Sequence, residues 1–323
     1  MSTVIYTKLG ERKGQKRLWL EGRRLARAGI TPGQHFELSH VEQTGKAGKG
    51  LVMRFVDTGE RRVSRRKRGG EELPVIDVSG EELTRTFGGA ERVRVVIRPG
   101  SIEITVHHHD RATAERAGRL IERLQAREPL RMGSLAHGGG ILDHALHRGL
   151  QAAGVPVELA FANESDGDYL EASLANNPIW HKDAIAIEAP MQDVEWRKLP
   201  PVDILAAGLP CTGASLSGRS KNRLAKAEEH ETAGPLFVAF IAAIQTLRPS
   251  VILLENVPQY GTTTSMTVIR SVLDSLDYEL HETVLDGFEL GALERRNRFC
   301  LVATNPEVPF AFDGLHPVRD RES

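Results

Sequence analysis

The sequence contains few cysteines, and their scarcity limits its chemistry. Only two of its 323 residues are cysteine, Cys211 and Cys300, and neither belongs to a Cys-x-x-Cys pair. Two separate thiols are too few for a disulfide framework or a thiolate zinc site. We therefore predict that the protein binds no metal and lies in the reducing cytoplasm.

Long apolar runs are also missing. No stretch of eighteen or more apolar residues occurs, so we expect no membrane-spanning helix. The first residues, Met1 to Val4, lack the basic and then apolar pattern of a signal peptide. Because 40% of the residues are hydrophobic, the composition favours a folded protein over global disorder.

The net charge of −1 hides an uneven distribution of charge. Residues 1–130 contain 26 basic and 17 acidic side chains, whereas the remainder contains 16 basic and 26 acidic ones. A basic half joined to an acidic half favours contact between the first half and a polyanion. A well-solvated basic surface is the alternative, and charge alone does not separate the two.

Residues 1–107 predict a small β-rich domain. The segments Arg92–Arg98 and Ser101–Val106 alternate apolar and polar residues, and Pro99-Gly100 between them predicts a hairpin. Residues 18–38 and 76–95 form a faint repeat of strand, short helix, turn and strand. This repeat resembles the half-barrel units of bacterial transition-state regulators and antitoxins, which form swapped-hairpin barrels that can bind DNA.

A strongly basic segment separates the two repeats. Six of the ten residues from Arg61 to Gly70 are Arg or Lys. Such density is self-repelling unless a polyanion relieves it, so we predict a loop that contacts nucleic acid through Arg65, Arg66 and Arg68. A solvated loop is the alternative. Residues 108–128 predict a linking helix, with an apolar stripe formed by Ala114, Ala117, Ile121 and Leu124.

From residue 129 onward, strands alternate with helices. Alternation of this kind predicts an α/β fold with a mostly parallel sheet covered by helices on both faces. The candidate strands are Leu130–Leu135, Val157–Ala162, Val202–Ala207, Val251–Leu254, Glu279–Val284 and Phe299–Thr304. The clearest candidate helices are Ile141–Ala153 and Pro235–Leu247. Ligands of such folds bind beyond the carboxyl ends of the strands.

Residues able to bind or react follow several of these strands. Gly138, Gly139 and Gly140 form a turn whose backbone could approach a ligand, and Glu164 closes the next strand, where an acid can accept bonds from ribose hydroxyls. Cys211 follows a buried strand and Pro210, and Glu255 ends another apolar strand. A thiol presented at a strand end is a candidate nucleophile.

The ordered set of motifs resembles the DNA cytosine-C5 methyltransferase family. Pro-Cys-x-x-x-Ser at residues 210–215 is followed by Glu-Asn-Val at 255–257 and Arg-x-Arg at 296–298. The resemblance covers roughly residues 130–310. It implies a Rossmann-like methyltransferase domain over residues 129–323, with S-adenosylmethionine as cofactor and double-stranded DNA as substrate.

The resemblance also implies roles for particular residues. Cys211 would add to C6 of a flipped-out cytosine, while Glu255, Arg296 and Arg298 would complete the catalytic set. The implied cofactor-binding residues are Leu135, Gly138, Gly139, Gly140, Glu164, Asp183, Gly208 and Pro210. The implied DNA-binding residues of the loop that follows Cys211 are Ser215, Arg219, Lys221 and Arg223.

The sequence departs from the family pattern at several points. Leu135 and His137 stand where the family usually has Phe and Gly, and Glu294 replaces the usual Gln. Few residues follow the last motif, so the usual downstream recognition domain has no room. We therefore expect residues 1–107 to recognise DNA and the linking helix to replace the family's closing helix.

Other functions are compatible with parts of this pattern. A tRNA cytosine methyltransferase shares much of the motif set, and a DNA-binding regulator with an inactive methyltransferase domain is a non-enzymatic alternative. A zinc-dependent cytosine deaminase is excluded, because it needs Pro-Cys-x-x-Cys and position 214 is alanine. A restriction endonuclease is a possible partner, and an enzyme acting on DNA would be associated with the nucleoid.

Overall fold

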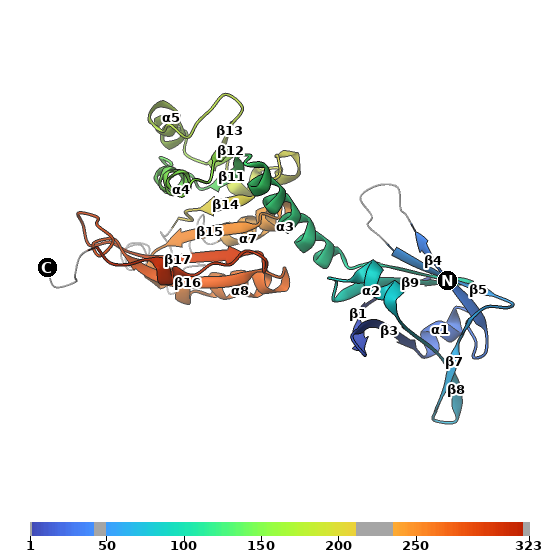
Figure 1. Cartoon of the computed structure of the whole chain (residues 1–323). Helices are drawn as coiled ribbons and strands as arrows, with labels where there is room; N and C mark the ends of the chain where they lie inside the picture. Colours follow the sequence, from blue (N-terminus) through green and yellow to red (C-terminus); the bar gives the residue numbers. More distant parts are fainter. Residues whose placement is uncertain (1, 42–49, 211–234, 319–323) are drawn as a thin grey trace. The chain divides into compact units, whose positions relative to one another are not determined.

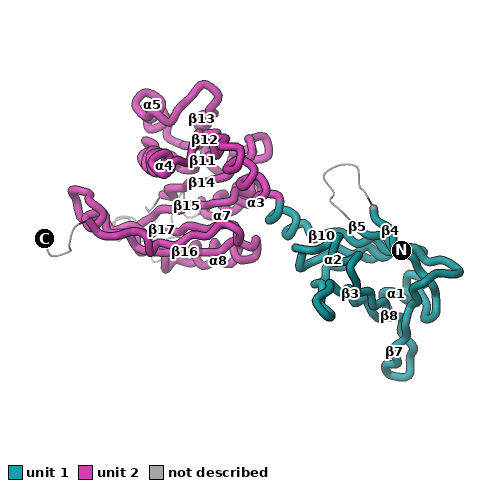
Figure 2. The backbone as a smooth tube through the Cα atoms, in the orientation of Figure 1, with its two compact units in different colours: residues 1–114 teal, residues 115–323 magenta. Residues whose placement is uncertain are grey.

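The computed structural model describes residues 2–41, 50–210 and 235–318, which form two compact units (Figure 2). Unit 1 comprises residues 1–114 and unit 2 residues 115–323. Helix α3, His108–Ala126, contains the boundary between them.

Unit 1 consists of two antiparallel sheets and two short helices. One sheet has the order β1-β9-β10-β5-β4-β6, and the other has the order β2-β3-β8-β7. The strands are β1 Thr3–Lys8, β2 Gly10–Arg12, β3 Gln15–Glu21, β4 His35–Val41, β5 Gly50–Val56, β6 Arg61–Arg62, β7 Ser64–Arg68, β8 Glu71–Ser79, β9 Arg92–Arg98 and β10 Ser101–Val106. The helices are α1 Arg23–Arg27 and α2 Glu81–Phe87.

The repeat predicted in unit 1 is present as β3-α1-β4 and β8-α2-β9. Its first strands pair with each other, with Leu18 opposite Val78 and Leu20 opposite Ile76. All four side chains are buried in the core of the unit. The predicted hairpin is also confirmed, since β9 pairs with β10 across Gly100. The resemblance to swapped-hairpin barrels stays a prediction.

The basic segment expected to be a loop is instead largely strand. Strand β7 pairs with β8 across a turn in which Gly69 and Gly70 adopt φ values of 58° and 83°. In this pairing Lys67 lies opposite Glu72 and Arg68 opposite Glu71. Opposite charges across a strand pair are stabilising, so the acidic partner strand offsets the repulsion that suggested a loop.

Unit 2 is built on one seven-stranded sheet (Figure 1). Its order is β13-β12-β11-β14-β15-β17-β16, and β17 runs antiparallel to both neighbours. The strands are β11 Leu130–Leu135, β12 Val157–Glu164, β13 Ile185–Glu188, β14 Ile204–Ala207, β15 Val251–Asn256, β16 Glu279–Asp286 and β17 Asn297–Thr304. The unit therefore has an α/β fold with a mostly parallel sheet, as the sequence predicted.

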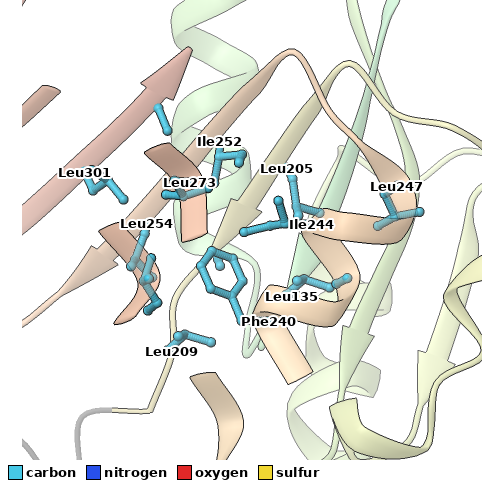
Figure 3. Packing of buried hydrophobic residues seen from close by; sticks show 14 of the residues in the cluster. Leu135, Leu205, Leu209, Phe240, Ile244, Leu247, Ile252, Leu254, Leu273 and Leu301 are labelled. Atoms are coloured by element: carbon cyan, nitrogen blue, oxygen red, sulfur yellow. The ribbon is translucent and has the colours of Figure 1, made fainter. Parts of the chain in front are cut away.

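Apolar cores cover both faces of this sheet. Consecutive residues Ile204 and Leu205 of β14 enter different clusters, as alternation along a strand requires. Phe240 of α7 is fully buried in the larger cluster and packs among residues of the sheet (Figure 3). The helices of unit 2 are α4 Ile141–Ala152, α5 Gly167–Asn176, α7 Leu236–Leu247 and α8 Thr264–Ser275, with short 3-10 turns η1 Met191–Asp193, η2 Trp196–Lys198, η4 Pro258–Thr262 and η5 Phe312–Gly314.

The predicted apolar stripe of α3 is buried at Ala117, which is 2% exposed, but Ala114 is exposed. Ile121 and Leu124 are 40% and 46% exposed, whereas Arg116 is only 2% exposed. The Arg116 guanidinium stacks on the Tyr278 ring at 3.9 Å and donates to the carbonyl oxygens of Leu276 and Asp277. Arg116 is therefore buried together with Ala112, Ala117 and Leu120, and apolar periodicity does not predict an arginine among them.

Candidate active site and cofactor site

The candidate site lies at one edge of the unit 2 sheet. Strands β11, β12, β13, β14 and β15 are parallel, so their carboxyl ends meet there, and antiparallel β17 begins at the same edge. Leu135, Glu164, Gly208, Glu255 and Arg298 therefore share one side of the sheet. This is the edge at which ligands bind in open α/β folds.

The glycine turn follows β11 and leads into α4. Gly138 and Gly140 adopt φ values of 55° and 73°, which favour glycine. A Cβ atom at Gly140 would collide with the side chains of His137 and Asn177, so only glycine fits there. At Gly138 and Gly139 a Cβ atom would meet no described atom within 4 Å, which leaves open space over the turn for a ligand.

A buried polar network holds this turn in place. His137 Nδ1 lies 2.8 Å from Asp143 Oδ2, and the Ser134 hydroxyl donates to the same carboxylate oxygen at 2.8 Å. On its other side, His137 Nε2 lies 2.7 Å from Ser173 Oγ of α5. Since buried polar groups are stable only when paired, the network fixes His137 against both helices. Sequence analysis recognised His137 only as a departure from the family pattern.

Glu164 closes β12 beside the glycine turn. Its Oε2 atom accepts a bond from the Gly138 amide at 2.7 Å, and its Oε1 atom accepts from the amides of Ser165 and Asp166. The structure thus brings two predicted cofactor residues into contact. Oε2 has a second lone pair, which could accept a bond from a ligand hydroxyl.

Asp183, predicted near the adenine of the cofactor, lies elsewhere. It stands in a turn before β13, at the amino end of that strand, away from the edge where the other residues meet. At the carboxyl end of β13, Glu188 pairs in register with Glu164. The sequence does not predict β13 or point to Glu188, because this strand is short, mostly exposed and without an apolar pattern. Glu188 thus occupies the position expected of Asp183.

The segment that precedes Cys211 is anchored to the sheet. The Gly208 amide donates to Leu135 O at 3.3 Å, and Asn256 Nδ2 donates to Leu209 O at 3.0 Å. Leu209 is buried, whereas Pro210 is exposed. The Asn256 bond ties the end of β15 to the residues leading into Cys211, which explains why an asparagine follows Glu255.

Glu255 and Arg298 form an ion pair. Arg298 Nε lies 2.7 Å from Glu255 Oε1, and both side chains are partly exposed, at 26% and 30%. The structure therefore brings together two predicted catalytic residues whose sequence positions are far apart. Arg296 lies just before β17 and is exposed, and no ion pair among the described residues joins it to Glu255.

Cys300, the second cysteine, lies opposite Glu255 in the pairing of β15 and β17. Burial, and to a smaller extent the negative charge of Glu255, raises the pKa of the Cys300 thiol to about 11. The thiol is therefore protonated near neutral pH, which makes it a poor nucleophile.

Several predicted residues lie outside the described part of the chain. They are Cys211, Ser215, Arg219, Lys221 and Arg223. In unit 1, Arg65, Arg66 and Arg68 are all exposed on β7. Arg65 pairs with Glu72 at 3.5 Å, and Arg66 pairs with Glu21 at 2.8 Å.

Neither a metal-binding cluster nor a membrane-spanning helix occurs in the described part of the chain. Within residues 2–41, 50–210 and 235–318, His, Cys, Asp and Glu side chains form no group of three or more that could hold a metal ion. No helix in those ranges has both the length and the apolar character needed to cross a membrane.

Comparison with known families decides the identity of unit 2. The profile of the family described as C-5 cytosine-specific DNA methylase matches residues 130–320, more than half of the chain. The chain belongs to this family. Membership in this family implies S-adenosylmethionine as the methyl donor, and the open glycine turn beside Glu164 fits such a cofactor.

The chain also resembles individual relatives over shorter stretches. It is 36% identical to the type II methyltransferase M.MspI of Moraxella sp over 123 residues, or 37% of this chain and 28% of the relative. It is 31% identical to a DNA-cytosine methyltransferase of Escherichia coli strain K12 over 139 residues, or 42% of this chain and 26% of the relative. The chain therefore spans only about a quarter of the length of these relatives.

Solved structures also resemble the chain. The S. pombe Dnmt2 methyltransferase has a TM-score of 0.44 and 17% identity, with 57% of this chain and 52% of that chain covered. The Entamoeba histolytica methyltransferase EhMeth has a TM-score of 0.48 and 15% identity, with 60% of this chain and 58% of that chain covered.

Proposed function

We propose that this protein transfers a methyl group from S-adenosylmethionine to C5 of cytosine in double-stranded DNA. The observation that carries the proposal is the 2.7 Å pair of Glu255 and Arg298 at the edge where Glu164 and the glycine turn also lie. In a methylase of this family, a carboxylate held beside an arginine at that edge suits recognition of the polar edge of a cytosine.

Cys211 is the proposed nucleophile. Its thiolate adds to C6 of the cytosine and thereby makes C5, otherwise a poor nucleophile, electron-rich. The reaction requires a cytosine flipped out of the duplex, because C6 is not accessible within the base stack. When bound, S-adenosylmethionine supplies the electrophilic methyl group. Transfer of the C5 proton to a solvent base, return of the N3 proton to Glu255 and cleavage of the bond between sulfur and C6 then regenerate the Cys211 thiolate.

Glu255, acting as an acid, gives a proton to N3, where the addition of the thiolate places negative charge, and accepts a hydrogen bond from the exocyclic amine. Arg298 orients the Glu255 carboxylate and contacts the base, and we assign to Arg296 a supporting role for the nucleophile. These roles require side chains that are held in position before the substrate binds. The ion pair between Glu255 and Arg298 holds both side chains in this way.

The cofactor would be held by the glycine turn and two acids. The backbone of Gly138, Gly139 and Gly140 leaves space for close approach, next to Leu135. Glu164 would accept bonds from ribose hydroxyls, and we assign the adenine-side acid to Glu188 in place of Asp183. Gly208 and Pro210 would border the cofactor on the side of Cys211.

The remaining assignments concern DNA and partners. We propose that Ser215, Arg219, Lys221 and Arg223 close over the duplex, and that the domain 1–107 recognises DNA while the helix 108–128 replaces the family's closing helix. A restriction endonuclease of the same specificity is the proposed partner, and the enzyme would act at the nucleoid in the cytoplasm.

Methyl transfer to nucleic acid tests the proposal directly. The full chain, incubated with tritiated S-adenosylmethionine, is expected to label duplex DNA but not tRNA. Bisulfite sequencing of DNA from cells that express the protein should then show methylated cytosines at a defined sequence. Label on tRNA alone would contradict the DNA assignment, and label on neither would favour a regulator with an inactive catalytic domain.

Glu164→Ala is expected to weaken cofactor binding at least about tenfold, because a bond to a charged acceptor contributes roughly 1.5–3 kcal/mol. Calorimetric titration with S-adenosylhomocysteine measures the effect. Glu158→Ala is the matched control, since Glu158 lies near the amino end of the same strand and pairs with Arg131 at 3.5 Å. Equal affinities for the two variants would move the ribose site away from Glu164.

A further inference from the structure

A cavity of about 620 Å³ in unit 1 is lined by five arginines. Three come from α1 and two from β7: Arg23, Arg24, Arg27, Arg66 and Arg68. Two glutamates, Glu21 and Glu71, also line it. We refer to this cavity as the arginine cleft. Five guanidinium groups against two carboxylates leave it with an excess of positive charge.

The two carboxylates are already engaged by two of the arginines. Arg66 Nη1 lies 2.8 Å from Glu21 Oε2, and Arg23 Nη2 lies 3.1 Å from Glu71 Oε2. The hydrogen bond from Arg66, followed by that from Trp19, lowers the pKa of Glu21, so this carboxylate stays ionised and occupied near neutral pH.

The other three arginines form no such ion pair, although the charge of Arg68 also acts on Glu21. Within the described part of unit 1, no ion pair engages Arg24, Arg27 or Arg68. All three side chains are exposed. Like charges gathered around one cavity repel each other, and an anion bound between them would relieve that repulsion.

The fold holds these arginines toward one cavity. Leu25 and Ala28, at 0% and 7% exposure, fix α1 against the core of unit 1, and Arg24 and Arg27 are three residues apart on the same helix face. On β7, Arg66 and Arg68 share a face because side chains alternate along a strand. Arg65 instead lines a separate cavity of about 370 Å³ with Glu72.

We propose that the arginine cleft binds phosphate groups of the DNA backbone and supplies much of the protein's affinity for duplex DNA. The planar guanidinium fork matches the paired oxygens of a phosphodiester, and arginine suits this task better than lysine. The choice of DNA as the polyanion rests on the proposed function. The sequence predicted DNA contacts only from residues of β7. The arginine cleft also includes the arginines of α1, and Arg65 of β7 is not part of it.

The test uses the full chain and a short fluorescent duplex, with binding measured by anisotropy at several salt concentrations. The triple variant R24A/R27A/R68A is expected to flatten the slope of log affinity against log salt by about two to three units, since each neutralised phosphate contributes about 0.9. The matched control R65A/K67A/R85A removes the same charge from side chains that pair with Glu72 and Glu81. It is expected to change the slope by less than about one unit.

Four outcomes would overturn the proposal. Equal flattening in both triple variants would mean that only net charge matters. An unchanged slope in R24A/R27A/R68A would mean that the cleft does not touch DNA. Loss of affinity for single-stranded RNA, with duplex binding intact, would make the cleft an RNA site. Competition by inorganic phosphate at low millimolar concentration would likewise mark a site for the free ion.

Failure of the proposed function is distinguishable from failure of the cleft. If the wild-type chain transfers no methyl group to DNA but R24A/R27A/R68A still weakens duplex binding selectively, the cleft stands and the catalytic assignment fails. Circular dichroism and thermal unfolding should give the same spectra and transitions for wild type and both triple variants, which confirms that unit 1, where all the substitutions lie, is folded.

Discussion

Cys211→Ala is expected to abolish methyl transfer to DNA. Removal of a covalent nucleophile eliminates the addition that activates C5, so the rate should fall by a factor on the order of 10⁴ or more. Transfer of tritiated methyl groups to duplex DNA measures the loss, and the affinity for S-adenosylhomocysteine should stay within about twofold of wild type. Activity within about tenfold of wild type would remove Cys211 from the mechanism.

Cys300 provides the internal comparison for this experiment. With a pKa raised to about 11 by burial, its thiol is protonated near neutral pH and should resist alkylation by iodoacetamide. Peptide mapping is expected to find the label on Cys211, with activity falling in step with labelling. Modification of Cys300 ahead of Cys211 would contradict both assignments.

The sheet of unit 2 was largely predictable because its strands are buried apolar runs. The predicted Leu130–Leu135 coincides with β11, and the predicted Val251–Leu254 lies within β15. Periodicity did not reveal the order of the strands, in which β17 inserts antiparallel between β15 and β16. That strand order brings Arg298 next to Glu255. The apolar periodicity of the sequence does not predict this contact. Only the family resemblance assigned the two residues to one site.

Two errors have a common physical origin. Sequence patterns register apolar side chains, whereas β13 is an exposed edge strand and the buried face of α3 contains Arg116. The missing strand hid Glu188, which we propose in place of Asp183, and the buried arginine displaced Ile121 and Leu124 of the predicted stripe to the exposed face, although Ala117 is buried. Polar groups that are satisfied by tertiary contacts leave no periodic signal.

The basic segment of unit 1 illustrates a different limit. A run of like charges suggested a loop, but the compensating acids Glu71 and Glu72 lie on the neighbouring strand of a hairpin. The sequence showed the density of charge correctly and did not show which arginines are neutralised. Only the three-dimensional pairing separates Arg68, without an ion pair among the described residues, from Arg65 and Arg66.

Glu255→Gln is expected to lower the turnover number by about a hundredfold or more, as loss of a positioned acid usually does. Glutamine keeps an oxygen that can accept the bond from Arg298 Nε, so the local geometry should persist while the negative charge is lost. Cofactor affinity should barely change, because the glycine turn and Glu164 lie on other strands.

Glu282→Gln is a closely matched control for that substitution. Glu282 of β16 pairs with Arg270 Nε at 2.7 Å, the same distance as in the pair of Glu255 and Arg298, and is 27% exposed against 30%. Any general effect of weakening a carboxylate–guanidinium pair in this sheet should therefore appear in both variants. If turnover falls only in Glu255→Gln, a carboxyl group that can transfer a proton is required for chemistry at the candidate site. If both variants lose activity equally, or if Glu255→Gln loses cofactor affinity with turnover intact, Glu255 does not hold the reacting base.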